Sequence, residues 1–311
     1  MNPLSIQAEI GNASDQGYAH RQYAESLEEF GAIRELPACR GQLLVRPVPK
    51  SNLFDGMGCY PLFCCQNWNA LRDDLESLAE QLVCVWLVTD PFADVDVSQL
   101  QNTFADVCYE YKQHFVTDLS VPLDSIVRGN HLRNCRKAMS AVEVCRSTPD
   151  KELLLQWQSL YDNLVKRHSV GGIAQFSHAA FERQMRVPGF TAFSALDRRC
   201  TCGMTLWYVQ GDVAYYHLGA YSDRGYENGA SFALFWRALT HFASMGVRWA
   251  ALGAGAGAQS SESGLTRFKQ GWATHTRSVY FCGRILQPAA YRGLSAVDPE
   301  KTGFFPAYRH P

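Results

Sequence analysis

The chain has 311 residues, of which 47% are hydrophobic and 19% are charged, so it is long enough for one large or two medium globular domains. Its formal net charge of −1 gives no long-range attraction to nucleic acid or to an anionic membrane surface. The longest clear apolar run, LVCVWLV over residues 82–88, is far shorter than the roughly 18 residues that span a bilayer. Residues 1–16 lack a basic stretch followed by an apolar core, so we expect no signal peptide and a cytoplasmic protein.

The 11 cysteines argue against a metal site or a disulfide framework. No C-x-x-C spacing occurs, and zinc and redox sites favour such short pairs. Cys84 and Cys282 lie inside apolar runs of strand character, where a free thiol behaves as a small hydrophobic side chain. We therefore expect buried free cysteines, no metal and a reducing compartment.

The first part of the chain alternates helix-like and strand-like segments with short connections, which is typical of an α/β layer. One predicted helix opens with Asn67, a residue type that often caps a helix N-terminus. In chain order the segments are helix 18–30, strands 42–48 and 57–65, helix 67–79, strand 82–88, a loop and helix over 92–111, strand 114–120, helix 129–140 and strand 142–146.

The most basic stretch of the chain falls on the predicted helix 129–140 and the residue just before it. A solvated helix face is one interpretation, and a site for RNA or for a phosphorylated lipid-linked sugar is another. No aromatic RNA-binding motif accompanies the stretch. Its basic side chains are Arg128, His131, Arg133, Arg136 and Lys137.

From residue 151 onward, two amphipathic helices precede a β-rich segment. Gln210-Gly211 joins two alternating apolar runs and predicts a tight β-hairpin. From Thr191 the predicted order is β-β-β-α-β-α-β, with a Gly-rich loop before the last helix. The segments are helices 151–168 and 177–185, strands 190–196, 200–209 and 212–222, helix 229–245, strand 247–253, loop 253–264, helix 265–272 and strand 277–286.

Four stretches of the chain carry a resemblance to a known family. They resemble the GNAT acyltransferases, in particular the Fem-type and CelD-type branch, in which two GNAT-like domains lie in tandem. The resemblance implies an α/β (α+β) fold of two GNAT-like domains, each a mixed twisted sheet flanked by helices. It implies a degenerate N-terminal domain at 1–148, an acyltransferase domain at 149–286 and a tail packed on the surface at 287–311. The stretches are NHLRNCRKA (130–138), YYHLGAYSDRGYENGASFALFWRAL (215–239), LGAGAG (252–257) and GLTRFKQGWATHTR (264–277).

The loop RGYENGA, residues 224–230, precedes the helix that follows the third strand of this segment. A Gly-bearing loop at a helix N-terminus suits an anion, although it also serves as an ordinary strand-to-helix connection. In CoA-using members of the resembled family the N–H groups of this loop hold the pyrophosphate, whereas Fem-type members with degenerate loops use aminoacyl-tRNA. This loop lacks the family's Gly-x-Gly, which leaves the donor open. The residues assigned to donor binding are Leu218, Gly219, Ala220, Arg224, Gly225, Asn228, Gly229 and Ala230.

Transfer of an acyl group to an amine needs a base for the amine and a hydrogen-bond donor for the developing oxyanion. His217 is the candidate general base, with a hydrogen-bonded core histidine as the alternative. Tyr216 is the candidate acid for the leaving group, with a core aromatic as the alternative. Glu227, together with Asp223, is a further acid/base pair or a pair of solvated turn residues. Strand alternation predicts one face with Tyr215, His217 and Gly219 and another with Tyr216, Leu218 and Ala220.

The short predicted helix after the Gly-rich loop carries two cations. In the resembled family the lysine that matches Lys269 faces the acceptor site and counters phosphate or carboxylate charge; the alternative is two exposed cations on a helix surface. Glycines in the loop allow a close approach of the backbone to a ligand. We assign substrate binding to Arg267, Lys269, Gly253 and Gly255.

The sequence therefore predicts a cytoplasmic GNAT-type N-acyltransferase. Its donor is expected to be acetyl-CoA or another acyl-CoA, and its acceptor the amine of a small metabolite, amino sugar or peptide-like molecule. Direct attack is expected because no serine or cysteine has the surroundings of a nucleophile. A Fem-type aminoacyl-tRNA-dependent peptide ligase is the second hypothesis, against which the net charge of −1 and the lack of a long coiled-coil arm count. A non-catalytic binding protein on a decayed GNAT fold is the third.

Overall fold

The computed structural model describes residues 16–255, 264–294 and 304–310. The chain packs into two compact units, which are described separately. Unit 1 contains residues 1–20 and 113–277, and unit 2 contains residues 21–112 and 278–311. Two long strands, β5 (Val107–Asp118) and β11 (His275–Ile285), contribute residues to both units. Most of the predicted Gly-rich loop and part of the predicted tail lie outside the described residues.

Unit 1 is built on a mixed sheet with the strand order β5-β10-β9-β8-β7-β6. The neighbouring strands are antiparallel except β9 and β10, which are parallel. A tight turn at Gly211, whose φ is +60°, joins β8 to β9 and confirms the predicted hairpin. The strands are β6 Glu143–Ser147, β7 Phe190–Asp197, β8 Cys200–Gln210, β9 Val213–Tyr221 and β10 Trp249–Gly253.

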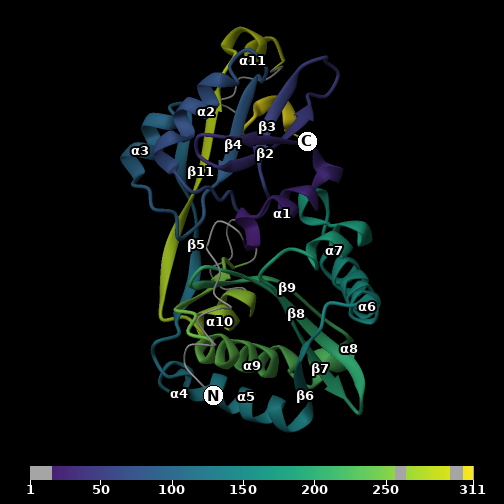
Figure 1. Ribbon diagram of the computed structural model, residues 1–311. Helices are drawn as coiled ribbons and strands as arrows, with labels where there is room; N and C mark the ends of the chain where they lie inside the picture. The colour runs from purple at the N-terminus through teal and green to yellow at the C-terminus, as the bar shows by residue number, and fades with distance from the viewer. Residues whose placement is uncertain (1–15, 256–263, 295–303, 311) are drawn as a thin grey trace. The chain divides into compact units, whose positions relative to one another are not determined.

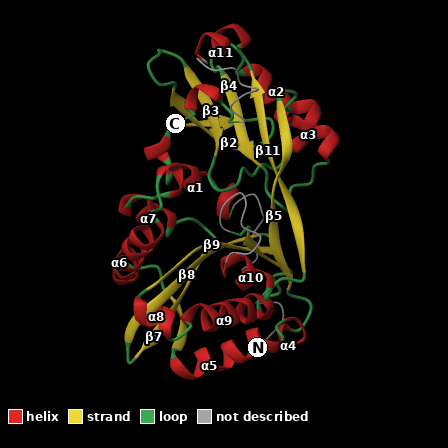
Figure 2. Cartoon of the chain, turned by 180° about the vertical axis from the view of Figure 1, so that it is seen from behind, coloured by secondary structure: helices red, strands yellow, loops and turns green. Residues whose placement is uncertain are grey.

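Helices cover both faces of the unit 1 sheet. α9 packs on β7, β8 and β9 with α5 beside it, and α6 and α7 lie on the opposite face (Figure 1; the same layers are seen from behind in Figure 2). The side chains of Asp150 and Ser177 cap α6 and α7 by accepting hydrogen bonds from the N–H groups of Leu153 and Ala180. The helices are α4 Leu123–Ile126, α5 Gly129–Ala141, α6 Lys151–His168, α7 His178–Gln184, α8 Asp223–Glu227, α9 Ala230–Ser244 and α10 Gly264–Gln270.

Unit 2 contains strands in the order β1-β2-β3-β4-β11, of which only β3 and β4 are parallel neighbours. Helices α2 and α3 cover one face, where Leu75, Leu100 and Val85 share a buried apolar cluster. The fully buried carboxylate of Asp55 on β3 pairs with Arg309 at 2.6 Å, which ties the end of the chain to this strand. The elements are α1 Arg21–Glu25, β1 Ala32–Leu36, β2 Gly41–Pro47, β3 Phe54–Gly58, α2 Leu71–Ser77, β4 Cys84–Val88, α3 Val97–Thr103 and α11 Pro288–Leu294.

The prediction of a loop and helix over 92–111 is wrong in its second half. Helix α3 ends at Thr103, and residues 107–111 belong to β5. Cys108 packs on the core of unit 2 while Tyr109, Glu110 and Tyr111 are all exposed, so this stretch has no buried side chains at helical spacing.

The predicted helix 18–30 is also broken, into the turn η4 (Gly17–Ala19), α1 and the turn η5 (Glu28–Phe30). His20 stands between the first two with extended backbone, at φ −74° and ψ 137°, which no helix can contain.

The predicted mixed α/β fold class is confirmed, because each unit combines a mixed sheet with flanking helices. Unit 1 takes in residues 113–148 together with most of 149–286, and unit 2 takes in the described part of the tail. The functional boundaries at residues 148 and 286 remain predictions. No helix in the described ranges is long and apolar enough to cross a membrane.

Candidate functional site

The parallel pairing of β9 and β10 ends in the middle of both strands. It runs from the pair Val213 and Trp249 to the pair Tyr215 and Ala251. β10 pairs with β5 along its length and ends at Gly253, while β9 continues to Tyr221 with β8 as its strand partner among the described residues. We call this point the fork. Because an edge of a strand offers its N–H and C=O groups to an extended ligand, residues 216–221 form a backbone surface for binding.

A β-bulge at His217 changes which side chains of β9 share a face. Tyr216 lies opposite Trp207, and Leu218 lies opposite Leu206, so His217 is one extra residue on β9. A Cβ atom on Gly219 would lie only 2.3 Å from the Tyr216 hydroxyl oxygen. Gly219 therefore shares the face of Tyr216, and the predicted strict alternation through residue 220 is wrong beyond the bulge.

His217 lies in a buried polar group on the α6 and α7 face. Its Nδ1 accepts a hydrogen bond of 3.0 Å from the Tyr18 hydroxyl, and its Nε2 donates one of 3.2 Å to the side-chain carbonyl of Gln184. The rings of Phe176 and Tyr208 lie 5.5 and 5.2 Å from the imidazole, centroid to centroid. Burial lowers the pKa of His217 to about 3, so the ring is neutral at neutral pH.

Tyr216 lies on the other face of β9, against Trp207 and Phe235 of α9. Burial raises the pKa of the Tyr216 hydroxyl and also that of Tyr221, and the two hydroxyls are hydrogen-bonded to each other. Both phenols are therefore protonated at neutral pH. The structure does not bring the three predicted catalytic residues together, because His217 and Tyr216 face opposite ways and Glu227 is exposed on α8. Their catalytic roles remain predictions.

Lys269 is a buried cation beside the fork. Its side chain donates a 2.7 Å hydrogen bond to the carbonyl oxygen of Ala254, and its ammonium lies 5.6 Å from the centre of the Tyr216 ring. Gly253, with φ +74°, ends β10 there, and a Cβ atom on it would lie 3.2 Å from the Lys269 ammonium. Gly255 packs on α10, since a Cβ atom on it would lie 2.1 Å from the Thr266 hydroxyl oxygen. Three of the four residues predicted for substrate binding thus come together, and Arg267 lies on the exposed side of α10.

Helix α10 is held by a histidine of the predicted basic stretch. His131 is half-buried, and its Nε2 donates a 2.9 Å hydrogen bond to the carbonyl oxygen of Phe268, the residue before Lys269. Burial lowers the pKa of His131. Gly271 provides the room, because a Cβ atom on it would lie 2.4 Å from this imidazole. His131 is therefore a positioning residue for α10.

The loop predicted to hold a pyrophosphate is mostly helical. Ser222 caps α8 by accepting a hydrogen bond from the Gly225 N–H, and the Tyr226 N–H donates to the Ser222 carbonyl. The N–H groups of Asn228 and Gly229 donate to carbonyl groups of the same segment. These four amides are thus engaged within the loop, and so the expectation that they are open to a phosphate group does not match their surroundings.

The polar side chains of this loop also have protein partners. Arg224 donates a 2.5 Å hydrogen bond to Asp197, whose pKa it lowers, and the Asn228 amide donates to the same carboxylate at 3.1 Å. Gly229 adopts φ +63° and is the N-cap residue of α9. The first N–H groups of a helix have no partner within it, so those of Ala230 and Ser231 are the donors that this segment offers to an anion.

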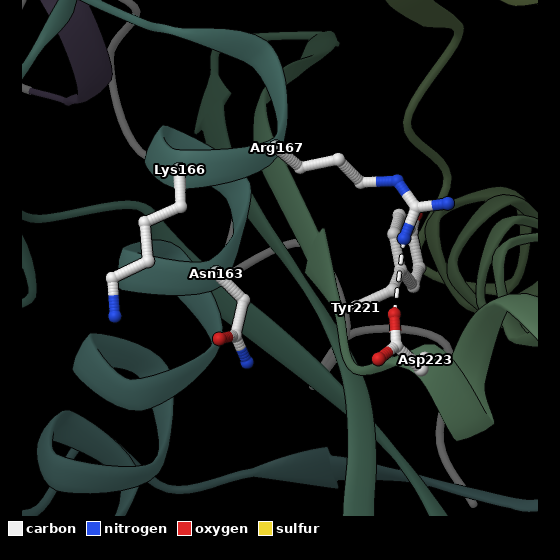
Figure 3. Close-up of a pocket in the computed structure, with 5 residues that line it drawn as sticks. All are labelled: Asn163, Lys166, Arg167, Tyr221 and Asp223. Carbon is white, nitrogen blue, oxygen red and sulfur yellow. Dashed lines mark hydrogen bonds and ion pairs between the residues drawn. The ribbon is translucent and has the colours of Figure 1, made fainter.

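An open surface pocket of about 280 Å³ lies where β9 ends (Figure 3). On one side Arg167 of α6 forms a 3.0 Å ion pair with Asp223 and lies 4.1 Å from the centre of the Tyr226 ring. Asn163 and Lys166, also on α6, line the other side (Figure 3). Sequence reasoning missed this pocket, because the basic last turn of α6 gave no sign that it packs beside Tyr221.

All 11 cysteines are free thiols, and the described residues contain no group of three or more His, Cys, Asp or Glu side chains that could hold a metal ion.

No protein-family model and no curated protein matches the sequence. The structure is similar to that of FemX, with a TM-score of 0.70 and 15% sequence identity, over 92% of this chain and 97% of that chain. It is also similar to the C-terminal domain of a putative lysylphosphatidylglycerol synthetase from Agrobacterium fabrum, with a TM-score of 0.63 and 11% identity, over 92% of this chain and 94% of that one. L-PGS from Bacillus licheniformis gives a TM-score of 0.60 at 13% identity, over 89% and 94%. The chain therefore has a FemX-like fold.

Proposed function

We propose that this chain transfers an acyl or aminoacyl group to an amine at the fork of unit 1. The observation that carries the proposal is the end of β9–β10 pairing at Tyr215, which leaves residues 216–221 as a backbone surface beside the buried Lys269. The similarity of fold to FemX and to lysylphosphatidylglycerol synthetases supports it, since the second name describes attachment of a lysyl group.

In this proposal the donor lies along β9 with its carbonyl oxygen accepting hydrogen bonds from backbone N–H groups. These donors are fixed before the reaction and stabilise the oxyanion that forms when the amine attacks. The Lys269 ammonium adds positive charge on the same side of β9 as Tyr216. Tyr216, whose raised pKa keeps it protonated, donates a hydrogen bond to the leaving oxygen or sulfur, and the leaving group takes up the proton that the attacking amine loses.

His217 suits a positioning role better than the base role predicted from sequence. A pKa of about 3 makes it a weak acceptor for the proton of an amine, and both ring nitrogens already have hydrogen-bond partners. We propose that it holds the bulge of β9 in place. The acceptor amine then enters in its neutral form or loses its proton to water.

The donor class we favour is an aminoacyl ester of the aminoacyl-tRNA kind. Four backbone amides of the loop 224–230 are bonded to residues 222–226 and its arginine pairs with Asp197, so the loop offers little to a CoA pyrophosphate. Acyl-CoA remains a second candidate, because the N–H groups of Ala230 and Ser231, the first of α9, have no partner within the helix and lie at the positive end of its dipole. The proposed acceptor is a small metabolite, an amino sugar or a peptide-like amine.

Ligand-induced changes in melting temperature test this proposal. The probe is an aminoacyl-tRNA whose ester is replaced by an amide, so that it cannot react during the measurement. At about a hundred times its Kd we expect it to add about 2.7 kcal/mol to the stability of unit 1. Uncharged tRNA should add less, because the acyl group and its carbonyl supply the contacts at the fork. If the melting temperature rises with CoA, acetyl-CoA or a long-chain acyl-CoA but not with the aminoacyl-tRNA, the donor is an acyl-CoA thioester.

Lys269→Met should reduce the ligand-induced rise, and Lys151→Met, at the exposed start of α6, should not. The comparison uses the ligand-induced rise and not the melting temperature itself. Lys269 is buried, so its substitution also changes the melting temperature of the ligand-free protein. No rise with any charged or thioester donor contradicts the proposed function.

A further inference from the structure

Helix α5 presents a basic face to solvent. The helix packs beside α9, with Cys135 and Ala138 buried in the core of unit 1 (Figures 1 and 2). Arg136 and Lys137 follow Arg133 by three and four residues, so the three side chains share the side of the helix that faces away from this core. All three are exposed, and we call them the basic face of α5.

No carboxylate neutralises this basic face. Neither α5 nor the neighbouring α9 contains an Asp or Glu residue, and α9 adds the exposed Arg237. None of these four cations forms an ion pair within the part of the chain that the structure describes. Like charges at this helical spacing repel each other, so the arrangement stabilises the protein only when an anionic partner is bound. Other exposed arginines of unit 1 do have carboxylate partners: Arg167 pairs with Asp223 at 3.0 Å, Arg186 with Glu182 at 2.5 Å and Arg248 with Asp118 at 3.3 Å.

The basic face belongs to a positively charged part of the chain. Residues 113–277, the larger segment of unit 1, carry 18 Lys and Arg residues and 12 Asp and Glu residues, which gives a formal charge of +6. All other residues carry 11 and 18, which gives −7 and accounts for the net charge of −1. The small net charge of the whole chain is therefore the sum of two opposite charges, and the field around this segment attracts a polyanion.

Helix α10 connects the basic face to the fork. His131, at the start of α5, holds α10 by its 2.9 Å hydrogen bond to the carbonyl oxygen of Phe268. Helix α10 places the buried Lys269 at the fork and exposes Arg267 on its outer side. Because α5 has 13 residues and is therefore about 20 Å long, an anionic chain that ends at the fork can cross α10 and continue along α5.

We propose that the basic face of α5 binds the phosphate backbone of the RNA that carries the donor acyl group. This inference rests on the proposed function, whose favoured donor is an aminoacyl-tRNA with its acylated end at the fork. Arginine suits this role because its guanidinium forms two parallel hydrogen bonds with phosphate oxygens. A membrane surface fits less well, because a helix that lies on lipid buries an apolar face, and Met139 is the one large apolar side chain that α5 exposes.

Binding of unacylated tRNA at several salt concentrations tests this inference without any transfer reaction. Fluorescence anisotropy of labelled tRNA measures Kd for the wild type and for the triple variant Arg133→Gln/Arg136→Gln/Lys137→Gln. At about 0.1 M salt we expect Kd of the variant to be at least about 10-fold higher. The slope of log Kd against log salt should fall by about 2–3, because each lost phosphate contact releases about one counterion fewer.

The matched control removes the same number of charges from other exposed positions of unit 1. It is the triple variant Lys151→Gln/Arg198→Gln/Arg199→Gln, whose Kd should stay within about threefold of the wild type, since charges far from the RNA are screened by salt. Removing like charges from α5 should leave its melting temperature equal to or above that of the wild type. If the α5 variant nevertheless unfolds, Arg136→Gln alone decides, with an expected fall in slope of about one.

Equal losses in the two triple variants, or no binding of tRNA by the wild type, overturn the inference. It is also overturned if the α5 variant binds tRNA normally but no longer binds vesicles of phosphatidylglycerol, because the basic face would then serve a membrane. Failure of the proposed function is a different result, namely no rise in melting temperature with any charged or thioester donor. The tRNA measurement is separate from that one, since unacylated tRNA lacks the group that is proposed to bind at the fork.

Discussion

Gly225→Ala is expected to lower the melting temperature of unit 1 by about 6–12 °C, which corresponds to about 3 kcal/mol for a domain of this size. A Cβ atom at this position would lie 2.0 Å from the backbone carbonyl oxygen of Cys202 and 3.0 Å from its carbon. The obstacle is backbone of β8, which carries hydrogen bonds to Ser222 and cannot rotate away as a side chain can. Helix α8 must therefore shift from the sheet. Thermal unfolding followed by circular dichroism measures the change.

Gly171→Ala is the matched control, because a Cβ atom there would have no neighbour within 4 Å. We expect it to stay within about 0.5 kcal/mol of the wild type. Equal melting temperatures for Gly225→Ala and Gly171→Ala would show that α8 does not pack closely on β8. The assignment of Gly225 to donor binding, made from the sequence, would then stand.

The stability of unit 1 should fall steeply as the pH falls below about 6.5, because of His217. The pKa of His217 is lowered from 6.5 to about 3 in the folded protein, so between these values the unfolded chain binds a proton that the folded chain does not. The sign is therefore a loss of folding free energy with decreasing pH, of about 1.4 kcal/mol per pH unit. Between about pH 7 and about pH 4.5 the loss from this one residue is about 2.5 kcal/mol.

Urea unfolding at several pH values measures this loss. The reference is His217→Gln, which keeps a hydrogen-bonding side chain between Tyr18 and Gln184 but does not titrate. Burial also lowers the pKa of His131, which adds pH dependence of the same sign to both proteins, so the difference between their slopes isolates His217. Parallel slopes for the two proteins would mean that His217 is solvated and free to act as the general base predicted from sequence.

The order of elements in unit 1 follows from the sequence because its signals are local. The alternation of β8 and β9 about Gly211 and the cap of α6 at Asp150 each depend on a few neighbouring residues. The bulge at His217 has no such mark. It appears only in the pairing of β9 with β8, where His217 is an extra residue and Gly219 therefore lies on the face of Tyr216. The residues Tyr215, Tyr216 and His217 suit a strand with this insertion as well as one without it.

The residues of the candidate site that a family resemblance named were predicted from the sequence. Features that depend on contacts between distant parts of the chain were not. Lys269 and Gly253 were both assigned to substrate binding, and the Lys269 ammonium lies 3.2 Å from where a Cβ atom on Gly253 would be. The sequence analysis did not predict that residues 223–227 form helix α8, although Ser222 is a typical N-cap residue.

Hydrogen exchange of the β9 amides, with and without donor, tests the central claim most directly. The donor is the one that gives the largest rise in melting temperature. We expect it to slow exchange at residues 216–221 and at Ala230 and Ser231, and to leave β6 unchanged, because the donor is proposed to lie along the forked edge of β9. A donor that stabilises the protein but slows exchange only in other strands would place the binding site elsewhere and contradict acyl transfer at the fork.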